Sequence, residues 1–272
     1  MTQLTDVALP SGIRLAHTDT GSGPTLLFHQ GFSLTQQIWE PLVSELTADF
    51  RCVTFDPRGH GASDAPESGY SIDHLAVDLA GLVAALNLTE VTLVGHSMGG
   101  AASLIAAADQ DADGPISRLV LLGPSAPGFV QREGQPYGAP AAVFSELRRG
   151  MDADFAANAR RSADMFFHQT DPEHARRIFE ATLAMRQDVA SALFADLEHL
   201  DLETDLSEVA VPVLALWGEH DNLADPRWAE WFRAKNLRNW QIDTLAHSGH
   251  GSMVDEPVEI ARRIREFVGV RA

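Results

Sequence analysis

Ser97 is the first residue whose type and setting could do chemistry, because it lies in the sequence Gly-His-Ser-Met-Gly. Four apolar residues at 91–94 precede this sequence, and an alanine-rich apolar stretch follows it. A serine in this setting is typical of a nucleophile on a tight turn between a strand and a helix. The turn needs glycine at 95 and 99, since side chains there would clash with the neighbouring strand and helix. This context favours a nucleophile over a chance match to a short pattern.

Asp221 is the candidate for the acid that such a serine requires. A serine hydroxyl is a poor nucleophile at neutral pH and needs a base within hydrogen-bond reach, which an acid must orient. Loops at the carboxyl ends of parallel strands supply such groups. Asp221 follows the apolar residues 213–217, whereas Glu219 lies closer to the strand and Asp225 precedes a proline, where a helix cap is expected.

His250 is the candidate for the base. It is flanked by glycines and lies just ahead of the final helix, whereas His247 is expected to be a structural or surface residue. The chain order Ser, Asp, His is the order expected for a serine on this kind of turn.

Acyl transfer also needs hydrogen-bond donors for the oxyanion, each worth roughly 10²- to 10³-fold in rate. One is expected from the backbone N–H of Met98, the residue after the nucleophile. The other is expected from the loop after residues 25–28, at the N–H of Phe32. The side chains of Phe32 and Met98 are then expected to form part of an apolar wall beside the scissile bond.

The remaining reactive side chains have simpler interpretations. His96 is expected to pack or bond within the turn, and His29 and His60 to support the site without touching the substrate. Cys52, the only cysteine, lies in an apolar run and is expected to be buried and inert. The other histidines lack partners at metal-ligand spacing, and no nucleotide-binding motif is present, so we expect neither a metal nor another cofactor.

Composition narrows the possible partners. The chain has 272 residues, with 38 acidic against 20 basic ones and a net charge of −18. This charge argues against binding to nucleic acid or to an anionic membrane. The N-terminus lacks the pattern of a leader and no apolar run could span a membrane, so we expect a cytoplasmic protein. A small-molecule ester or lactone is the expected partner, and both a monomer and a homodimer fit the sequence.

Stretches with strand character alternate with helices along most of the chain, which predicts an α/β fold with a mostly parallel, doubly wound sheet. An antiparallel hairpin is expected at the N-terminus, from residues 7–9 and 13–16. The strands expected after it are 25–28, 51–55, 91–94, 118–122, 213–217 and 240–244. The helices expected are 36–48, 71–86, one from 98, 226–235 and 255–268.

The alternation stops after the strand at 118–122. A stretch rich in proline and glycine follows, and then only helical patterns up to about residue 206. This predicts a core formed by 1–124 and 207–272, with a helical lid inserted at 125–206. The lid is rich in phenylalanine, and Phe166 and Phe167 are candidates for an apolar acyl pocket.

Four segments together resemble the α/β-hydrolase superfamily, in the branch of small, soluble, lid-bearing serine hydrolases. They are Asp-Pro-Arg-Gly-His-Gly-Ala-Ser-Asp at 56–64, Gly-His-Ser-Met-Gly-Gly at 95–100, Trp-Gly-Glu-His-Asp at 217–221, and Gly-His at 249–250 followed by Asp-Glu-Pro at 255–257. The resemblance implies that Ser97, Asp221 and His250 are nucleophile, acid and base, and that the N–H groups of Phe32 and Met98 are the oxyanion donors.

The chain departs from the family at one position: Gln30-Gly31 stands where the family commonly has His-Gly, with His29 one place early. The donor at Phe32 is a backbone group, so the oxyanion hole is expected to survive this change.

The function expected from these residues is cofactor-free hydrolysis of a small carboxylic ester or lactone through an acyl-enzyme on Ser97. Carbon–carbon bond hydrolases and perhydrolases use the same triad, and the residues around Ser97 do not separate these activities. A slow-turnover ligand receptor is a further alternative, which an intact triad disfavours.

Overall fold

One mostly parallel sheet forms the centre of the molecule. The computed structural model describes residues 3–169 and 171–270. Within them the strands form a single sheet in the order β1-β2-β4-β3-β5-β6-β7-β8. β1 pairs with β2, and β2 with β4, in antiparallel fashion; every other neighbouring pair is parallel. The strands are β1 (Thr5–Ala8), β2 (Arg14–Gly21), β3 (Thr25–His29), β4 (Arg51–Phe55), β5 (Val91–His96), β6 (Ile116–Leu122), β7 (Val213–Gly218) and β8 (Trp240–Leu245).

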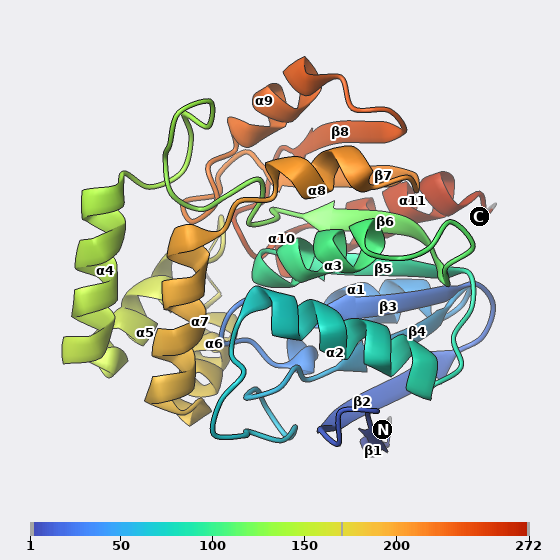
Figure 1. The fold of residues 1–272 in the computed structure, drawn as a ribbon, viewed down its shortest axis with the longest axis horizontal. Helices are drawn as coiled ribbons and strands as arrows, with labels where there is room; N and C mark the ends of the chain where they lie inside the picture. Colours follow the sequence, from blue (N-terminus) through green and yellow to red (C-terminus); the bar gives the residue numbers. More distant parts are fainter. Residues whose placement is uncertain (1–2, 170, 271–272) are drawn as a thin grey trace.

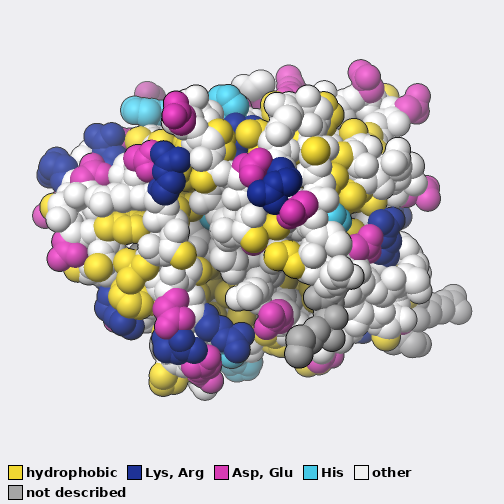
Figure 2. All heavy atoms as spheres, turned by 90° about the horizontal axis from the view of Figure 1, so that it is seen from below, with side chains coloured by type: hydrophobic (Ala, Val, Ile, Leu, Met, Phe, Trp, Pro, Cys, Tyr) yellow, Lys and Arg dark blue, Asp and Glu magenta, His cyan; other side chains and the backbone are white. Residues whose placement is uncertain are grey.

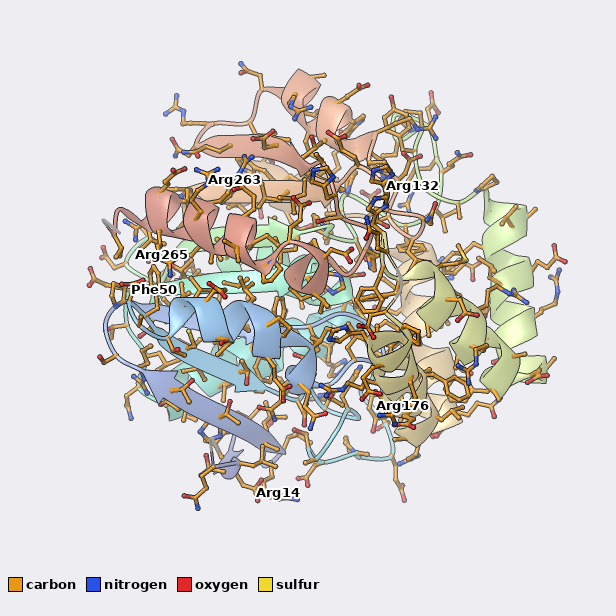
Figure 3. The ribbon with its side chains drawn as sticks, turned by 180° about the vertical axis from the view of Figure 1, so that it is seen from behind. Arg14, Phe50, Arg132, Arg176, Arg263 and Arg265 are labelled. Carbon is orange, nitrogen blue, oxygen red and sulfur yellow. The ribbon has the colours of Figure 1, made fainter. Side chains whose placement is uncertain are left out.

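Helices cover both faces of this sheet, as the alternation of strands and helices predicts. Figure 1 shows α2 (Ile72–Ala85), α3 (Met98–Ala108) and α8 (Glu203–Glu208) in front of the sheet. It shows α1 (Glu40–Leu46) and α11 (Pro257–Val268) behind it. Figure 3, drawn from behind, shows Arg263 and Arg265 along α11. The α/β-hydrolase fold expected from the sequence is therefore confirmed.

Alternating side chains on the central strands explain the two layers. Successive residues of a strand face opposite sides of the sheet. Leu93 packs with α2 and α3 on one face, whereas Val94 packs with Trp39 and the residues of α1 and α11 on the other. Leu93 and Val94 are both fully buried. A continuous apolar run such as the start of β5 is expected of a strand that is covered on both faces.

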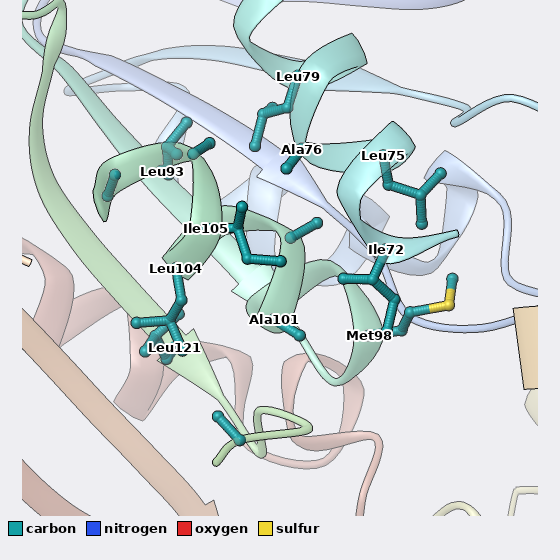
Figure 4. Packing of buried hydrophobic residues seen from close by; sticks show 14 of the residues in the cluster. Ile72, Leu75, Ala76, Leu79, Leu93, Met98, Ala101, Leu104, Ile105 and Leu121 are labelled. Atoms are coloured by element: carbon teal, nitrogen blue, oxygen red, sulfur yellow. The ribbon is translucent and has the colours of Figure 1, made fainter. Parts of the chain in front are cut away.

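The helical spacing of apolar residues places α2 against α3. Figure 4 shows Ile72, Leu75, Ala76 and Leu79 of α2 facing Ala101 and Ile105 of α3. The α2 residues follow the i, i+3, i+4, i+7 pattern of a helix with one buried face. Met98 lies beside Ile72 in the same cluster, with its side chain fully buried.

The boundaries of three elements differ from those expected. β2 continues to Gly21, well beyond the expected residue 16, and pairs with β4. Its second half is polar, so no apolar run marks it. Proline divides both of the other elements: η1 (Gln36–Trp39) gives way to α1 near Pro41, and α10 (Ser252–Asp255) ends before α11 starts at Pro257. Proline is tolerated only in the first turn of a helix, which accounts for both breaks.

Helices follow one another between β6 and β7. They are α4 (Ala141–Ala153), α5 (Phe155–Met165), α6 (Pro172–Ala184), α7 (Gln187–His199) and then α8. Figure 1 shows α4 to α7 grouped beside the sheet. In the described part of this segment the only β-pairing consists of two isolated bridges, Val130 with Ala139 and Arg132 with Gln135.

Charges of both signs are mixed over the surface. On the face drawn in Figure 2, acidic side chains lie next to basic ones. Arg14, for instance, pairs with both Asp6 and Asp64. Across residues 3–169 and 171–270, no helix combines the length and the apolar character needed to span a membrane.

A buried ion pair joins the loop after β4 to α2. The Arg58 guanidinium donates from Nε and Nη2 to the two carboxylate oxygens of Asp78, at 2.5 and 2.6 Å, and from Nη1 to the Gly69 carbonyl. The two paired side chains are 7% and 2% exposed. Such a pair is costly to break from one side, because the remaining charge stays buried without its partner.

We predict that Asp78→Ala lowers the free energy of unfolding by about 3–5 kcal/mol, measured by urea denaturation. The matched control is Asp6→Ala, which removes an exposed partner of Arg14 and should cost less than about 1 kcal/mol. Equal losses for the two variants would contradict the importance of the buried pair.

Candidate active site

Ser97 occupies a strained turn between β5 and α3. Its backbone has φ 51° and ψ −121°, outside the regions that non-glycine residues normally adopt. Such a conformation costs about 1–3 kcal/mol and persists only where the surroundings hold it. The Ser97 N–H donates to the Leu122 carbonyl at 3.1 Å, and the Ser97 carbonyl accepts from Ser125 N–H at 3.0 Å and from Ala101 N–H at 3.1 Å.

Glycine is required on both sides of this turn, as the sequence predicted. A Cβ at Gly95 would lie 2.7 Å from the Cα of Gly100 in α3. A Cβ at Gly99 would overlap the carbonyl oxygens of His29 and Gln30, at the end of β3. The expected clashes with the neighbouring helix and strand are therefore confirmed.

The structure brings Asp221 and His250 together. The loop after β7 carries Asp221, the loop after β8 carries His250, and His250 Nδ1 donates to Asp221 Oδ2 at 2.8 Å. The other carboxylate oxygen accepts from the N–H groups of Leu223 and Ala224, at 2.8 and 2.7 Å. Both side chains are buried, at 5% and 1% exposure. This geometry fixes the proton on Nδ1 and leaves Nε2 as an acceptor.

Ser97 and His250 line the same cavity, which has a volume of about 100 Å³. Ser97 Oγ lies 3.4 Å from Ser125 Oγ. A hydrogen bond from Ser97 to His250 is not among those that the described residues make. Hydrogen bonds between such side chains often shorten only when the substrate binds. The cavity that Ser97 and His250 share therefore shows that the two side chains can act on one bound molecule.

His96 supports the backbone of the His250 loop. Its Nε2 donates to the His250 carbonyl at 3.0 Å, and the two imidazole rings lie 4.6 Å apart. Burial, and then the neighbouring His250, hold the pKa of His96 well below its usual range. His96 is thus a neutral donor that links the turn at Ser97 to the His250 loop, so its hydrogen bond crosses to a different loop and is not made within the turn.

Two acidic residues brace the loop that carries His250. Asp255 Oδ2 accepts from Gly249 N–H at 2.8 Å and from His168 N–H at 3.1 Å. Glu256 Oε2 accepts from the N–H of His247 and the hydroxyl of Ser248. The Asp-Glu pair is part of a motif in the sequence, but its role could not be predicted, because the fold is what brings groups such as the His168 N–H to it.

The expected oxyanion donors both have a free N–H. Neither the Phe32 N–H nor the Met98 N–H donates to an acceptor within residues 3–169 and 171–270. Gly31 brings the Phe32 loop against Ser97, since a Cβ there would lie 2.9 Å from the Cβ of Ser97. Met98 is the first residue of α3, where N–H groups lack partners within the helix.

The apolar residues expected around the site separate into two groups. Phe32 and Phe166 line the cavity with Ser97 and His250. Phe167 is buried behind Phe166, with ring centroids 5.1 Å apart, and the Met98 side chain packs in the core. The structure therefore places neither Phe167 nor the Met98 side chain in the cavity wall: Phe167 packs against Phe166 and His174, and Met98 packs in the core with Ile72.

Other titratable groups near the sheet are buried. Burial lowers the pKa of His29 to about 3 and that of His60 to about 4. Burial also raises the pKa of the Cys52 thiol to about 12, as expected for an inert cysteine. In the part of the chain that the structure describes, three or more His, Cys, Asp or Glu side chains nowhere gather as a metal site would need.

Comparisons with known proteins point to one family. A model of the family described as alpha/beta hydrolase fold matches residues 24–257. The AB hydrolase superfamily protein YisY of Bacillus subtilis (strain 168) is 29% identical over 253 residues, covering 92% of this chain and 93% of that protein. The non-heme haloperoxidase of Rhodococcus erythropolis is 29% identical over 80% of this chain and 82% of its own length. The esterase (EaEST) of Exiguobacterium antarcticum superposes with a TM-score of 0.92 at 26% identity, covering 98% of this chain and 100% of that one.

The buried His29 gives a prediction for stability against pH. In the unfolded chain a histidine binds a proton below about pH 6.5, whereas the folded chain keeps His29 neutral down to about pH 3. The unfolded state then binds more protons, so the contribution of His29 to stability is complete above about pH 6.5 and falls on acidification. We expect His29→Leu to reduce the fall of unfolding free energy between pH 6 and 4 by about 1.4 kcal/mol per pH unit. Urea denaturation at several pH values measures this slope, and parallel curves for the two proteins would contradict the prediction.

Proposed function

Because this chain belongs to the α/β-hydrolase family, we propose that it is a cofactor-free serine hydrolase that cleaves a small carboxylic ester or lactone. One observation carries the proposal: the histidine that Asp221 holds by a 2.8 Å hydrogen bond shares a cavity with a serine on a strained turn. A buried acid, a base of fixed tautomer and an adjacent hydroxyl are the parts that nucleophilic acyl transfer requires.

The proposed reaction passes through an acyl-enzyme on Ser97. His250 Nε2 takes the hydroxyl proton as Oγ attacks the carbonyl carbon, which gives a tetrahedral intermediate. The C–O bond to the alcohol then breaks, and His250 gives its proton to the departing oxygen. Water, activated by His250, attacks the ester on Ser97 and releases the acid, while Asp221 holds the imidazolium that forms in each half-reaction.

The N–H groups of Phe32 and Met98 are proposed to bind the oxyanion. Both groups lack an acceptor among the described residues. Phe32 follows Gly31, which packs against Ser97, and Met98 directly follows Ser97 in the chain. The first turn of α3 adds the positive end of the helix dipole, which favours negative charge at this position. The donor at Phe32 is a backbone group, so we expect Gln30, in place of the family's usual histidine, to leave the oxyanion hole intact.

The cavity dimensions support a small acyl group. The chamber next to Ser97 measures about 100 Å³, below the roughly 300–1,000 Å³ of pockets that bind drug-sized molecules. It adjoins a second cavity of about 470 Å³. Five residues line both cavities: Phe129, Asn158, Ser162, Phe194 and Leu223. We assign the inner chamber to the acyl group and the outer cavity to the alcohol.

We further propose that residues 125–206 act as a lid over Ser97, with 1–124 and 207–272 as the hydrolase core. Helices α5, α6 and α7 support this assignment, since each contributes to the inner chamber: Ser162 from α5, Ile178 from α6 and Phe194 from α7. The lid, rather than the sheet, would then determine which acyl groups fit.

A perhydrolase is the second candidate, because a relative from Acinetobacter calcoaceticus, 25% identical over 96% of this chain, is named a bifunctional esterase/perhydrolase. Hydrogen peroxide would replace water in attacking the acyl-enzyme and would release a peracid. Carbon–carbon bond hydrolysis would use the same serine and histidine. Comparing an ester with and without hydrogen peroxide, a lactone and a vinylogous diketone as substrates separates the three activities.

We predict that Ser97→Ala and His250→Ala each lower kcat for p-nitrophenyl butyrate by at least about 10³-fold. Steady-state assays of the purified proteins provide the measurement. The matched controls are Ser145→Ala and His247→Ala, which replace a serine bonded to Glu198 and an exposed histidine outside the cavity, and which should leave kcat unchanged. Hydrolysis by Ser97→Ala at the parent rate would refute the proposed function.

We predict that kcat/KM for p-nitrophenyl butyrate exceeds that for the octanoate by at least about tenfold, since methylenes that do not fit a pocket are strongly rejected. Phe194→Ala removes a ring that lines both cavities and should shift this preference toward the octanoate. Phe267→Ala, on α11 at the opposite face, is the matched control. A preference that Phe194→Ala leaves unchanged would contradict the assignment of the chamber.

A further inference from the structure

Ser33, the residue after the expected oxyanion donor, has an unusual backbone. Its φ is +58°, in the left-handed region that glycine normally occupies. The Leu34 N–H donates to the Gly31 carbonyl at 3.4 Å, so residues 31–34 form a turn whose third residue has positive φ. Glycine or asparagine usually fills that position. A serine there needs contacts that keep it in place.

Two hydrogen bonds from opposite sides hold Ser33. Its N–H donates to His60 Nε2 at 3.2 Å, and His60 Nδ1 in turn donates to the Arg58 carbonyl at 3.0 Å. Its hydroxyl lies 2.8 Å from the hydroxyl of Thr182 in α6. Ser33 is 7% exposed and Thr182 4%, so water does not replace these partners freely.

The direction of the hydroxyl bond follows from the chemistry of Thr182. Its only hydroxyl proton goes to the Ile178 carbonyl, at 2.9 Å within α6. Thr182 can therefore only accept from Ser33, and Ser33 is the donor. Ser33 thus donates one hydrogen bond to His60, through its N–H, and one to α6, through its hydroxyl.

We propose that Ser33 and Thr182 are a positioning pair. Their hydrogen bond ties the turn at 31–34 to α6, so the position of α6 determines the direction of the Phe32 N–H in the oxyanion hole. The inference rests on the proposed function. With the Ser33 N–H committed to His60, the Phe32 N–H is the donor of this turn that stays available to the substrate. Thr182 prevents the turn from relaxing, so the lid and the oxyanion donor act as one unit.

The first test replaces the two hydroxyls. Ser33→Ala, Thr182→Val and the double variant are compared with the parent on p-nitrophenyl butyrate. Each single variant should lose about 3- to 10-fold in kcat, the range expected for one neutral hydrogen bond, with KM unchanged. The double variant should be no worse than the poorer single one, because both remove the same bond. Losses that multiply, or unchanged kcat in both single variants, would overturn the proposal.

Ser33→Gly separates the bond from the strain. Glycine adopts φ +58° readily, so this variant folds even where Ser33→Ala does not. It lacks the hydroxyl and should show the same loss of kcat as Thr182→Val. Parent-level kcat in Ser33→Gly would overturn the proposal.

Binding of phenylboronic acid, whose adduct on serine is tetrahedral, provides a second readout. Its affinity should fall by the same factor as kcat/KM in each variant, whereas a merely structural role would lower only the free energy of unfolding. Ser145→Ala is the control, since it removes a lid hydroxyl bonded to Glu198. A parent enzyme that hydrolyses no ester would refute the proposed function, and the pair with it; an active, Ser97-dependent enzyme with unaffected pair variants would refute the pair alone.

Discussion

The positive φ of Ser97 is the constraint on which the rest of the site depends. At this angle the chain leaves β5 and enters α3 within one residue, with the hydroxyl facing the cavity and the next N–H in the first turn of the helix. Residues 95 and 99 must be glycine, and β6 must end where Leu122 and Ser125 can form hydrogen bonds with the turn. Central strands buried on both faces supply the rigidity that such a conformation requires.

The remaining groups reach Ser97 because parallel strands end at one edge of the sheet. Phe32 follows β3, Asp221 follows β7 and His250 follows β8, so residues far apart in sequence meet there. Other elements hold the loop that carries His250: Asp221 through the imidazole, His96 through the carbonyl, and the segment after α5, whose Phe166 carbonyl accepts from Gly251 N–H at 2.8 Å. These contacts add to those of Asp255 and Glu256. The helices beside the sheet therefore contribute to the order of the site as well as to its walls.

The sequence predicted features that local pattern encodes. The glycines lie within two residues of Ser97, and Asp221 and His250 follow the last two strands of the sheet, of which β7 is buried and β8 is mostly half-buried. Their meeting could therefore be expected, and their catalytic roles remain a prediction. The polar half of β2 carries no apolar run and was missed. Phe166 and Phe167 are neighbours whose orientation depends on a distant loop, and Ser33 meets Thr182 across 149 positions. No pattern within a single segment could show these contacts.

Met98 illustrates how one residue can serve two parts of the protein. Its N–H, in the first turn of α3, lacks an acceptor among the described residues, while its side chain fills the core beside Ile72 and is fully buried. Evolution can therefore exchange this side chain for another of similar volume without changing what the substrate meets. Substrate range, by contrast, can diverge through the cavity-lining residues of α5, α6 and α7, while buried side chains such as that of Met98 stay under selection for packing. A mutational library aimed at new substrates would spare position 98 and vary positions such as 162, 178 and 194.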